Sequence, residues 1–330
     1  MKNVIRTAAL AGASLVLGLS AQASQVNPGS LLVFPSFDNT RGDYTLLTVT
    51  NMNDDQTNGT VKVEFVYINH DNCQEFNRTR TLTPDDTITV VTKVDNPNQV
   101  FGYCYVFAKH KTTGAAIKFD YLIGTERVLS CNDGDYEVQP FVFQAGAGLA
   151  DGANTDANGN GLRDLNGTEY SKAPDTLYIP RFLGQCDAVQ SKLALIALTG
   201  GAQFDTLVNF LIYNDNEEVF SAQRSFNCYE QCDLLHISGV FGNDFLLSTN
   251  HNQNEIQWPN NPLVDNVNPP EAGWFSLKGA IANSSAASFS NPSILAALIE
   301  RTPDGSGTVL PFVTGERANG SLLSQSIFGN

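Results

Sequence analysis

Hydrophobic and polar residues alternate along several short stretches of the chain, which is the pattern of half-buried β-strands. The clearest stretch is 60–69, where four apolar residues lie on one side and two charged residues on the other: Val61, Val63, Phe65 and Tyr67 against Lys62 and Glu64. Further strands are predicted over 46–50, 87–92, 103–108, 117–122, 192–198, 207–213 and 275–280. Turn-forming pairs such as Asn58-Gly59 separate them. The pattern therefore predicts many short antiparallel strands.

The chain also contains an internal duplication. Residues 32–37 (LVFPSF) recur 145 residues later as 177–182 (LYIPRF), and at the same offset 63–69 (VEFVYIN) match 208–214 (VNFLIYN). Further along the offset is 171, where Gly102-Tyr103 corresponds to Gly273-Trp274 and 140–142 (PFV) to 311–313 (PFV). The change of offset implies about 26 extra residues in the second copy, between about 238 and 271.

Together these patterns predict an all-β fold of two tandem immunoglobulin-like antiparallel β-sandwich domains related by internal duplication. The first domain spans 24–145 and the second 174–330, and a Gly/Asn/Asp-rich connection over 146–173 joins them. The insertion near 238–271 is either a binding loop or a segment that packs across the partner domain. Only 292–301 favours a helix.

The first 23 residues have the order of a secretory signal peptide. Lys2 and Arg6 precede an apolar stretch over 8–19, and Ala21-Gln22-Ala23 offers small residues for cleavage. The apolar stretch is shorter than the roughly 20 residues that span a bilayer, and no later segment is apolar enough to do so. We therefore expect export to the cell surface or the extracellular space, with the periplasm as the other destination.

The charge balance is acidic, with 19 Lys plus Arg against 34 Asp plus Glu and a net charge of −15. Such a surface repels nucleic acid, and the sequence has no basic stripe that would follow a phosphate backbone. The acidic residues either attract divalent cations or only keep the protein soluble.

Six cysteines follow the signal segment, and an even number in an exported chain favours disulfides: Cys73, Cys104, Cys131, Cys186, Cys228 and Cys232. Cys73 and Cys104 lie in neighbouring predicted strands or their turns, so they are expected to staple the first domain. In the second, Cys186 is expected to pair with Cys228 or Cys232, which leaves Cys131 for the remaining cysteine or an external partner. No histidine pair or second cysteine pair completes a zinc site.

The connection between the domains contains a candidate calcium loop. Its proposed oxygen ligands are Asp156, Asn158, Asn160, Asp164 and Glu169. The first four occupy positions one, three, five and nine, and Gly161 occupies position six, where the chain must turn sharply. Over about a dozen residues this segment resembles the loops of EF-hands, dockerins and thrombospondin type 3 repeats, which implies calcium as a cofactor.

The loop departs from that pattern at position twelve, where Gly167 replaces the bidentate glutamate. Glu169 takes that role only if the loop is longer than usual. The other interpretation is a flexible Gly- and Asn-rich linker. If calcium binds, it is expected to stiffen the connection and fix the angle between the domains.

No catalytic pattern stands out. The four histidines, His70, His110, His236 and His251, are scattered, and neither a Gly-x-Ser-x-Gly elbow nor a His-Glu-x-x-His motif occurs. The leading hypothesis is a noncatalytic structural, adhesive or assembly protein. Residues 320–323 (GSLL) repeat 29–32 (GSLL), so the C-terminal tail either adds a strand to a neighbouring subunit or completes its own domain.

The alternative hypothesis is a carbohydrate-binding protein, with Trp258 as the strongest probe and His251 as a weaker ligand-binding candidate in the same insertion. Tyr178 and Trp274 are further aromatic candidates, but Trp274 aligns with Tyr103 and is expected in the core. A secreted hydrolase is the third hypothesis.

Overall fold

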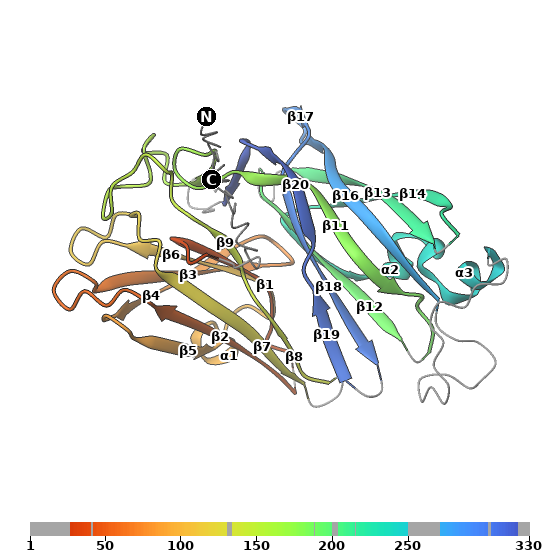
Figure 1. The fold of residues 1–330 in the computed structure, drawn as a ribbon, viewed down its shortest axis with the longest axis horizontal. Helices are drawn as coiled ribbons and strands as arrows, with labels where there is room; N and C mark the ends of the chain where they lie inside the picture. Colours follow the sequence, from red (N-terminus) through yellow and green to blue (C-terminus); the bar gives the residue numbers. More distant parts are fainter. Residues whose placement is uncertain are drawn as a thin grey trace, which may run out of the picture.

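The computed structural model of the protein describes residues 27–40, 42–130, 134–187, 189–199, 204–214, 216–249, 271–302 and 305–322. Nearly all of its regular elements are β-strands (Figure 1), which confirms the prediction of an all-β protein. The signal segment 1–23, Cys131, His251 and Trp258 lie outside the described residues.

The first half of the chain is here called the first repeat, and its described residues form nine strands and one short helix: β1 (Leu31–Asp38), β2 (Asp43–Asn51), β3 (Val61–Asn69), β4 (Glu75–Leu82), β5 (Thr87–Val91), α1 (Thr92–Asp95), β6 (Phe101–Lys109), β7 (Leu122–Ser130), β8 (Tyr136–Val138) and β9 (Phe141–Phe143). The strands predicted over 46–50, 60–69, 87–92 and 103–108 are confirmed. The strand predicted over 117–122 begins only at Leu122.

After β10 (Arg163–Leu165), the second repeat consists of β11 (Ala173–Leu183), β12 (Gln190–Ala197), β13 (Asp205–Asn214), β14 (Val219–Phe226), β15 (Tyr229–Asp233), α2 (Leu234–Ile237), η2 (Gly239–Phe241), α3 (Asn243–Thr249), β16 (Ala272–Asn283), β17 (Ser288–Ser290), β18 (Ile294–Thr302), β19 (Gly305–Val309) and β20 (Phe312–Arg317). The last strand, β21 (Gly320–Leu322), pairs with β10.

Both repeats build two antiparallel sheets with the same strand order. The first repeat has β4-β3-β6-β1-β9 and β5-β2-β7-β8, and the second has β14-β13-β16-β11-β20, with β17 beside β16, and β15-β12-β18-β19. The duplication therefore extends from sequence to topology. The shared order does not by itself place the repeats in the immunoglobulin-like class, so that finer assignment stays a prediction.

The four sheets follow one another across the molecule in a propeller-like succession (Figure 1). The two sheets in the middle of this succession, those of β1 and β12, are buried on both faces. In β1, Leu32 and Phe34 pack with Leu47 of the neighbouring sheet of the same repeat. Leu31 and Val33, which point to the opposite face, pack with residues of β12 in the second repeat such as Ile196. The second repeat has its own core between its two sheets.

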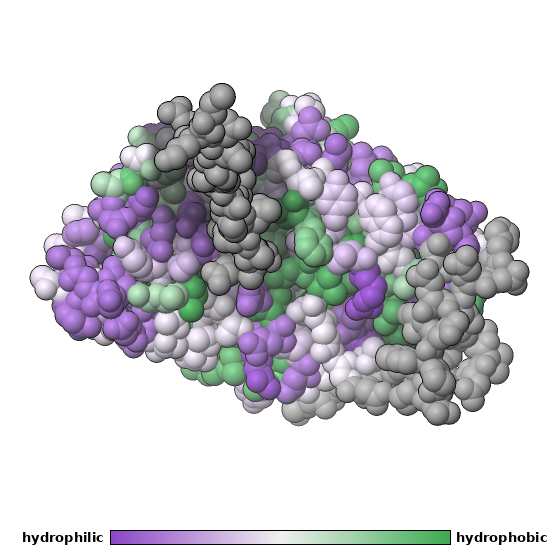
Figure 2. Space-filling view, in the orientation of Figure 1, coloured by the Kyte–Doolittle hydropathy of each residue, from purple (hydrophilic) through white to green (hydrophobic). Residues whose placement is uncertain are grey.

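The core between the repeats, here called the seam, joins them into one body. Buried members from the first repeat include Tyr103 and Tyr105, and those from the second include Tyr229 and Leu295. Figure 2 shows hydrophobic residues gathered in the middle of the molecule, whereas hydrophilic residues cover the end formed by the first repeat. Because apolar burial is the main favourable term in folding, the seam resists separation of the repeats.

One disulfide crosses the seam, between Cys73 and Cys228. The predicted pairings of Cys73 with Cys104 and of Cys186 with Cys228 are therefore wrong. They assumed that each repeat is stapled internally, whereas the turn after β3 lies against the start of β15 in the other repeat. Cys104 and Cys232 are buried thiols, and Cys186 is a half-buried one.

One further feature predicted from local pattern also differs. Residues 292–301, the only stretch predicted to be helical, contribute to strand β18, which pairs with β12 on one side and β19 on the other. Its apolar run is buried on both faces of the sheet. A continuous apolar run does not distinguish a buried strand from a buried helix. Among the described residues, no helix is long and apolar enough to cross a membrane.

The described part of the insertion, which includes η2 and α3, packs on its own repeat. Phe241 and Leu246 are buried in the core of the second repeat. Because α2 follows β15 as α1 follows β5, the extra residues begin after α2.

Candidate functional site

The connection 146–173 lies on the seam and contacts both repeats. The amide of Thr155 donates to the Ala116 carbonyl at 3.0 Å, and β10 pairs with β21 at the C-terminal end of the described chain. Leu165 and Tyr170 are fully buried in the seam core. This segment is therefore a packed part of the structure, and the flexible-linker interpretation of it is wrong.

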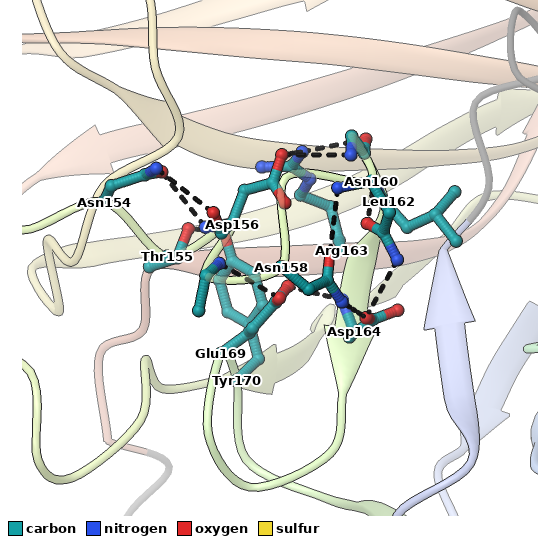
Figure 3. A network of polar contacts seen from close by, with 12 residues as sticks. Asn154, Thr155, Asp156, Asn158, Asn160, Leu162, Arg163, Asp164, Glu169 and Tyr170 are labelled. Atoms are coloured by element: carbon teal, nitrogen blue, oxygen red, sulfur yellow. Dashed lines mark hydrogen bonds and ion pairs between the residues drawn. The ribbon is translucent and has the colours of Figure 1, made fainter.

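Within this segment, the predicted ligands form one polar network (Figure 3). Asp156 Oδ2 accepts from the Gly161 amide at 3.0 Å, and Asn160 Oδ1 accepts from the Leu162 amide at 2.8 Å. Gly161 has φ 77°, in the left-handed region, as the sharp turn at position six requires. The backbone thus wraps so that alternate side chains turn inward.

Asp164 receives the side chains of both asparagines. Its Oδ2 atom accepts from Asn158 Nδ2 at 2.8 Å and from Asn160 Nδ2 at 3.2 Å (Figure 3). These amide donors offset the carboxylate charge in the way that a cation would. Rotation of each amide would present its oxygen instead, and oxygen is the donor that calcium prefers.

Asp156 is the loop carboxylate with a free acceptor. Its Oδ1 atom is buried and has no hydrogen-bond partner in the described part of the chain. Its Oδ2 atom lies 3.8 Å from Arg163 Nη2, and the Arg163 guanidinium lies over the Phe107 ring at 4.7 Å. Sequence reasoning missed Arg163, although it is the one basic residue of 154–169. Its charge partly offsets that of Asp156.

Glu169 lies inside the loop although it falls two residues beyond the usual ligand position. It is 1% exposed, its Oε1 accepts from the Ala157 amide at 3.1 Å, and its Oε2 from the Asp164 amide at 3.3 Å. Burial raises the pKa of Glu169, and the nearby charges of Asp164 and Asp156 act in the same direction. A bound cation would counter this shift.

The structure thus brings all five predicted oxygen-bearing side chains into one loop. Two carboxylates and two amides surround the turn, and a third carboxylate closes it. Among the described residues, no group of three or more His, Cys, Asp or Glu side chains is arranged to hold a metal ion. Any cation site here therefore needs the Asn158 and Asn160 amide oxygens as well.

None of the three described histidines is hydrogen-bonded to a serine, threonine or cysteine side chain that could act as a nucleophile. His70 Nδ1 lies 3.1 Å from the Tyr229 carbonyl across the seam, and His110 Nδ1 accepts amides of its own turn. His236 lies 4.0 Å from Asp233 at the surface. His70 is thus a seam contact.

Of the aromatic candidates, Trp274 is 38% exposed, so the expectation that it lies in the core is wrong. It stacks on Tyr213, with ring centroids 3.9 Å apart and planes 3° apart. Trp258 and His251 lie outside the described residues.

Comparison with known proteins found no matching family model and no matching curated protein. Among solved structures, the crystal structure of Thermotoga maritima 1070 matches at 11% sequence identity, covering 39% of this chain and 100% of that chain, with a TM-score of 0.27. A superposition this loose does not establish a shared fold.

Proposed function

We propose that this chain is an exported, noncatalytic structural protein of the bacterial cell surface or extracellular space, whose loop at the seam binds calcium. The observation that carries the proposal is the union of two repeats by a shared core and by the Cys73–Cys228 disulfide. A disulfide fits an oxidising compartment and the predicted signal segment. The same proposal keeps the immunoglobulin-like class for each repeat.

Calcium in this proposal has a local role. The seam and the disulfide already hold the repeats together, so the proposal gives calcium no role in setting their angle. The cation would instead replace the amide donors on Asp164 and bind Asp156 Oδ1, which lowers the cost of burying Glu169. The loop and β21, which pairs with its β10 strand, would gain stability.

The test is calorimetric titration of the mature, oxidised protein with calcium chloride, beside an Asp156→Ala/Asp164→Ala variant. We expect binding in the millimolar class typical of extracellular modules, and its loss in the variant. Asp151→Ala is the matched control, because Asp151 is an exposed acid of the same connection outside the loop. No binding heat with the native protein, or equal heats in all three proteins, would refute the calcium site.

The structural role is tested separately by light scattering over a range of protein concentrations, with and without calcium. Assembly predicts a mass that rises with concentration. A monomer under every condition would remove the assembly role and leave the chain as a monomeric spacer or adhesive module.

A further inference from the structure

The outer face of the larger sheet of the second repeat contains an open cleft, here called the outer cleft. Its volume is about 750 Å³, within the size range of small-molecule sites, roughly 300–1,000 Å³. It runs across β11, β13, β14 and β16, and its lining includes Thr176, Tyr178, Asn209, Gln223, Ser276 and Lys278. In the first repeat the equivalent face is buried in the seam.

The duplication allows each position of this exposed face to be compared with its buried counterpart. At three positions, the exposed face of the second repeat carries an aromatic side chain that is larger than the buried residue at the equivalent position of the first repeat. The pairs are Val33 and Tyr178, Ile68 and Tyr213, and Tyr103 and Trp274. The three first-repeat residues are at most 3% exposed, whereas Trp274 is 38% exposed.

In the middle of the same face, the side chains of the second repeat are more polar than their counterparts in the first. Where the seam buries Leu31, Tyr105 and Phe107, the outer cleft presents a hydroxyl, a second hydroxyl and an ammonium group, from Thr176, Ser276 and Lys278. Exposure to water explains Lys278 and the half-buried Thr176, whereas Ser276 is only 8% exposed at the floor of the cleft. Exposure does not explain the enlarged aromatics beside them, because large apolar side chains are not favoured on a surface that contacts only water.

We propose that the outer cleft binds an oligosaccharide. Sugars present flat faces of C–H groups, which pack on aromatic rings, and a rim of hydroxyls, which need hydrogen-bond partners. Trp274 and Tyr213 stack on each other at one end of the same sheet face, beside the residues that line the cleft, and Tyr178 lines the cleft itself. Aromatic rings beside a polar floor are the two kinds of contact that a pyranose ring needs.

Several polar groups of the cleft are available for a ligand. The hydroxyls of Ser221 and Ser276 have no hydrogen-bond partner within the described ranges. The amides of Asn209 and Gln223 bond to each other at 2.8 Å and keep further donor and acceptor capacity. A buried apolar partner would leave these groups unsatisfied, whereas sugar hydroxyls would satisfy them.

Because the sheets stack on one another, a second copy of the chain is the other possible occupant of this face. The outer face of the β2 sheet, at the other end of the stack, would have to pack on it, and that face is too polar to do so. At the seam, β12 presents Ala194 and Ile196, but the equivalent places in β2 are Thr48 and Thr50. These threonines pair their hydroxyls with Thr89 and Thr87, at 2.9 and 2.8 Å. A polar end face of this kind is typical of a terminal, capping repeat.

The proposal is tested on the mature, oxidised protein with a printed array of neutral and acidic oligosaccharides, followed by calorimetry with the strongest binder. We expect Trp274→Ala to weaken binding about tenfold or more, since exposed aromatic anchors dominate such sites. Ser276→Tyr introduces the side chain found at Tyr105 and should fill the cleft and abolish binding. Tyr44→Ala, at an aromatic residue that is 49% exposed on the first repeat, should leave binding unchanged.

Each variant is compared with the native protein by circular dichroism and thermal midpoint, and Ser276→Tyr decides the question if Trp274→Ala does not fold. Absence of binding to every glycan overturns the proposal. Native binding that survives both Trp274→Ala and Ser276→Tyr overturns it too, and binding lost in Trp258→Ala alone would place the sugar site in the insertion. None of these outcomes bears on the calcium loop, so the two proposals fail independently.

Discussion

Glu126 is a buried carboxyl group beside the irregular part of β1, where the pairing with β6 shifts register between Phe34 and Phe37. The Ser36 amide, which this irregularity frees, donates to Glu126 Oε2 at 3.1 Å. Burial raises the pKa of Glu126 to about 8, although the Ser36 hydrogen bonds oppose the shift. In the unfolded chain the pKa of this carboxyl group has its ordinary value of about 4.5. The native state therefore binds one more proton than the unfolded state between these values.

The stability that the protonated Glu126 provides is complete below about pH 4.5 and is lost as pH rises to about 8. We predict that the free energy of unfolding of the native protein falls by about 1.4 kcal/mol per pH unit, relative to Glu126→Gln, across this range. Above about pH 8 the difference should level off. Denaturant titrations from pH 5 to 9 measure it.

Glu316→Gln is the control, because Glu316 is exposed on β20. The Glu126→Gln data are compared with this same substitution at an exposed site. A constant difference between Glu126→Gln and the native protein over the whole range would contradict the assignment.

At the scale of elements, β3, β6 and β1 approach one another closely at Gly102. A Cβ atom there would lie 1.8 Å from the Ile68 carbonyl oxygen and 3.1 Å from the Phe37 ring. The second repeat repeats this contact at Gly273, against the Tyr213 carbonyl at 2.4 Å and the Phe182 ring at 2.7 Å. The matched glycines found by sequence comparison thus have a steric cause.

We predict that Gly102→Ala lowers the free energy of unfolding by about 3 kcal/mol, because the strands must separate to admit the methyl group. Chemical denaturation measures the loss. Gly148→Ala is the control, since nothing lies within 4 Å of its added Cβ. Equal stabilities of the two variants would show that the strands adjust without cost.

At the scale of the whole molecule, the seam core and the Cys73–Cys228 disulfide hold the repeats together by independent means. The disulfide links residues 155 positions apart, so it removes much conformational freedom from the unfolded chain. We predict that Cys73→Ser/Cys228→Ser lowers the free energy of unfolding by about 4 kcal/mol. Because the seam core remains, the variant should still unfold in one transition, measured by calorimetry.

Cys186→Ser serves as the control, because Cys186 is a half-buried thiol outside any disulfide in the described structure. Two separate transitions in the double variant would mean that the seam core alone does not couple the repeats.

Local alternation and repetition in the sequence by themselves determined most of the strands and the duplication. In β3, Val61, Val63, Phe65 and Tyr67 alternate with charged residues at the start of the strand, and this period correctly predicts one buried face, although the seam also buries Val66 and Ile68 on the other. The spacing of Asp156, Asn158, Asn160 and Asp164 likewise placed four polar side chains in one loop, because it is a property of neighbouring residues.

Only the tertiary structure decided which repeat covers which face. Tyr103 and Trp274 occupy equivalent positions, yet one is 3% and the other 38% exposed, because a second sheet lies over β6 and none of the described sheets lies over the outer face of β16. The pairing of Cys73 with Cys228 has the same origin. Both depend on contacts between residues far apart in the chain, and local periodicity carries no information on such contacts.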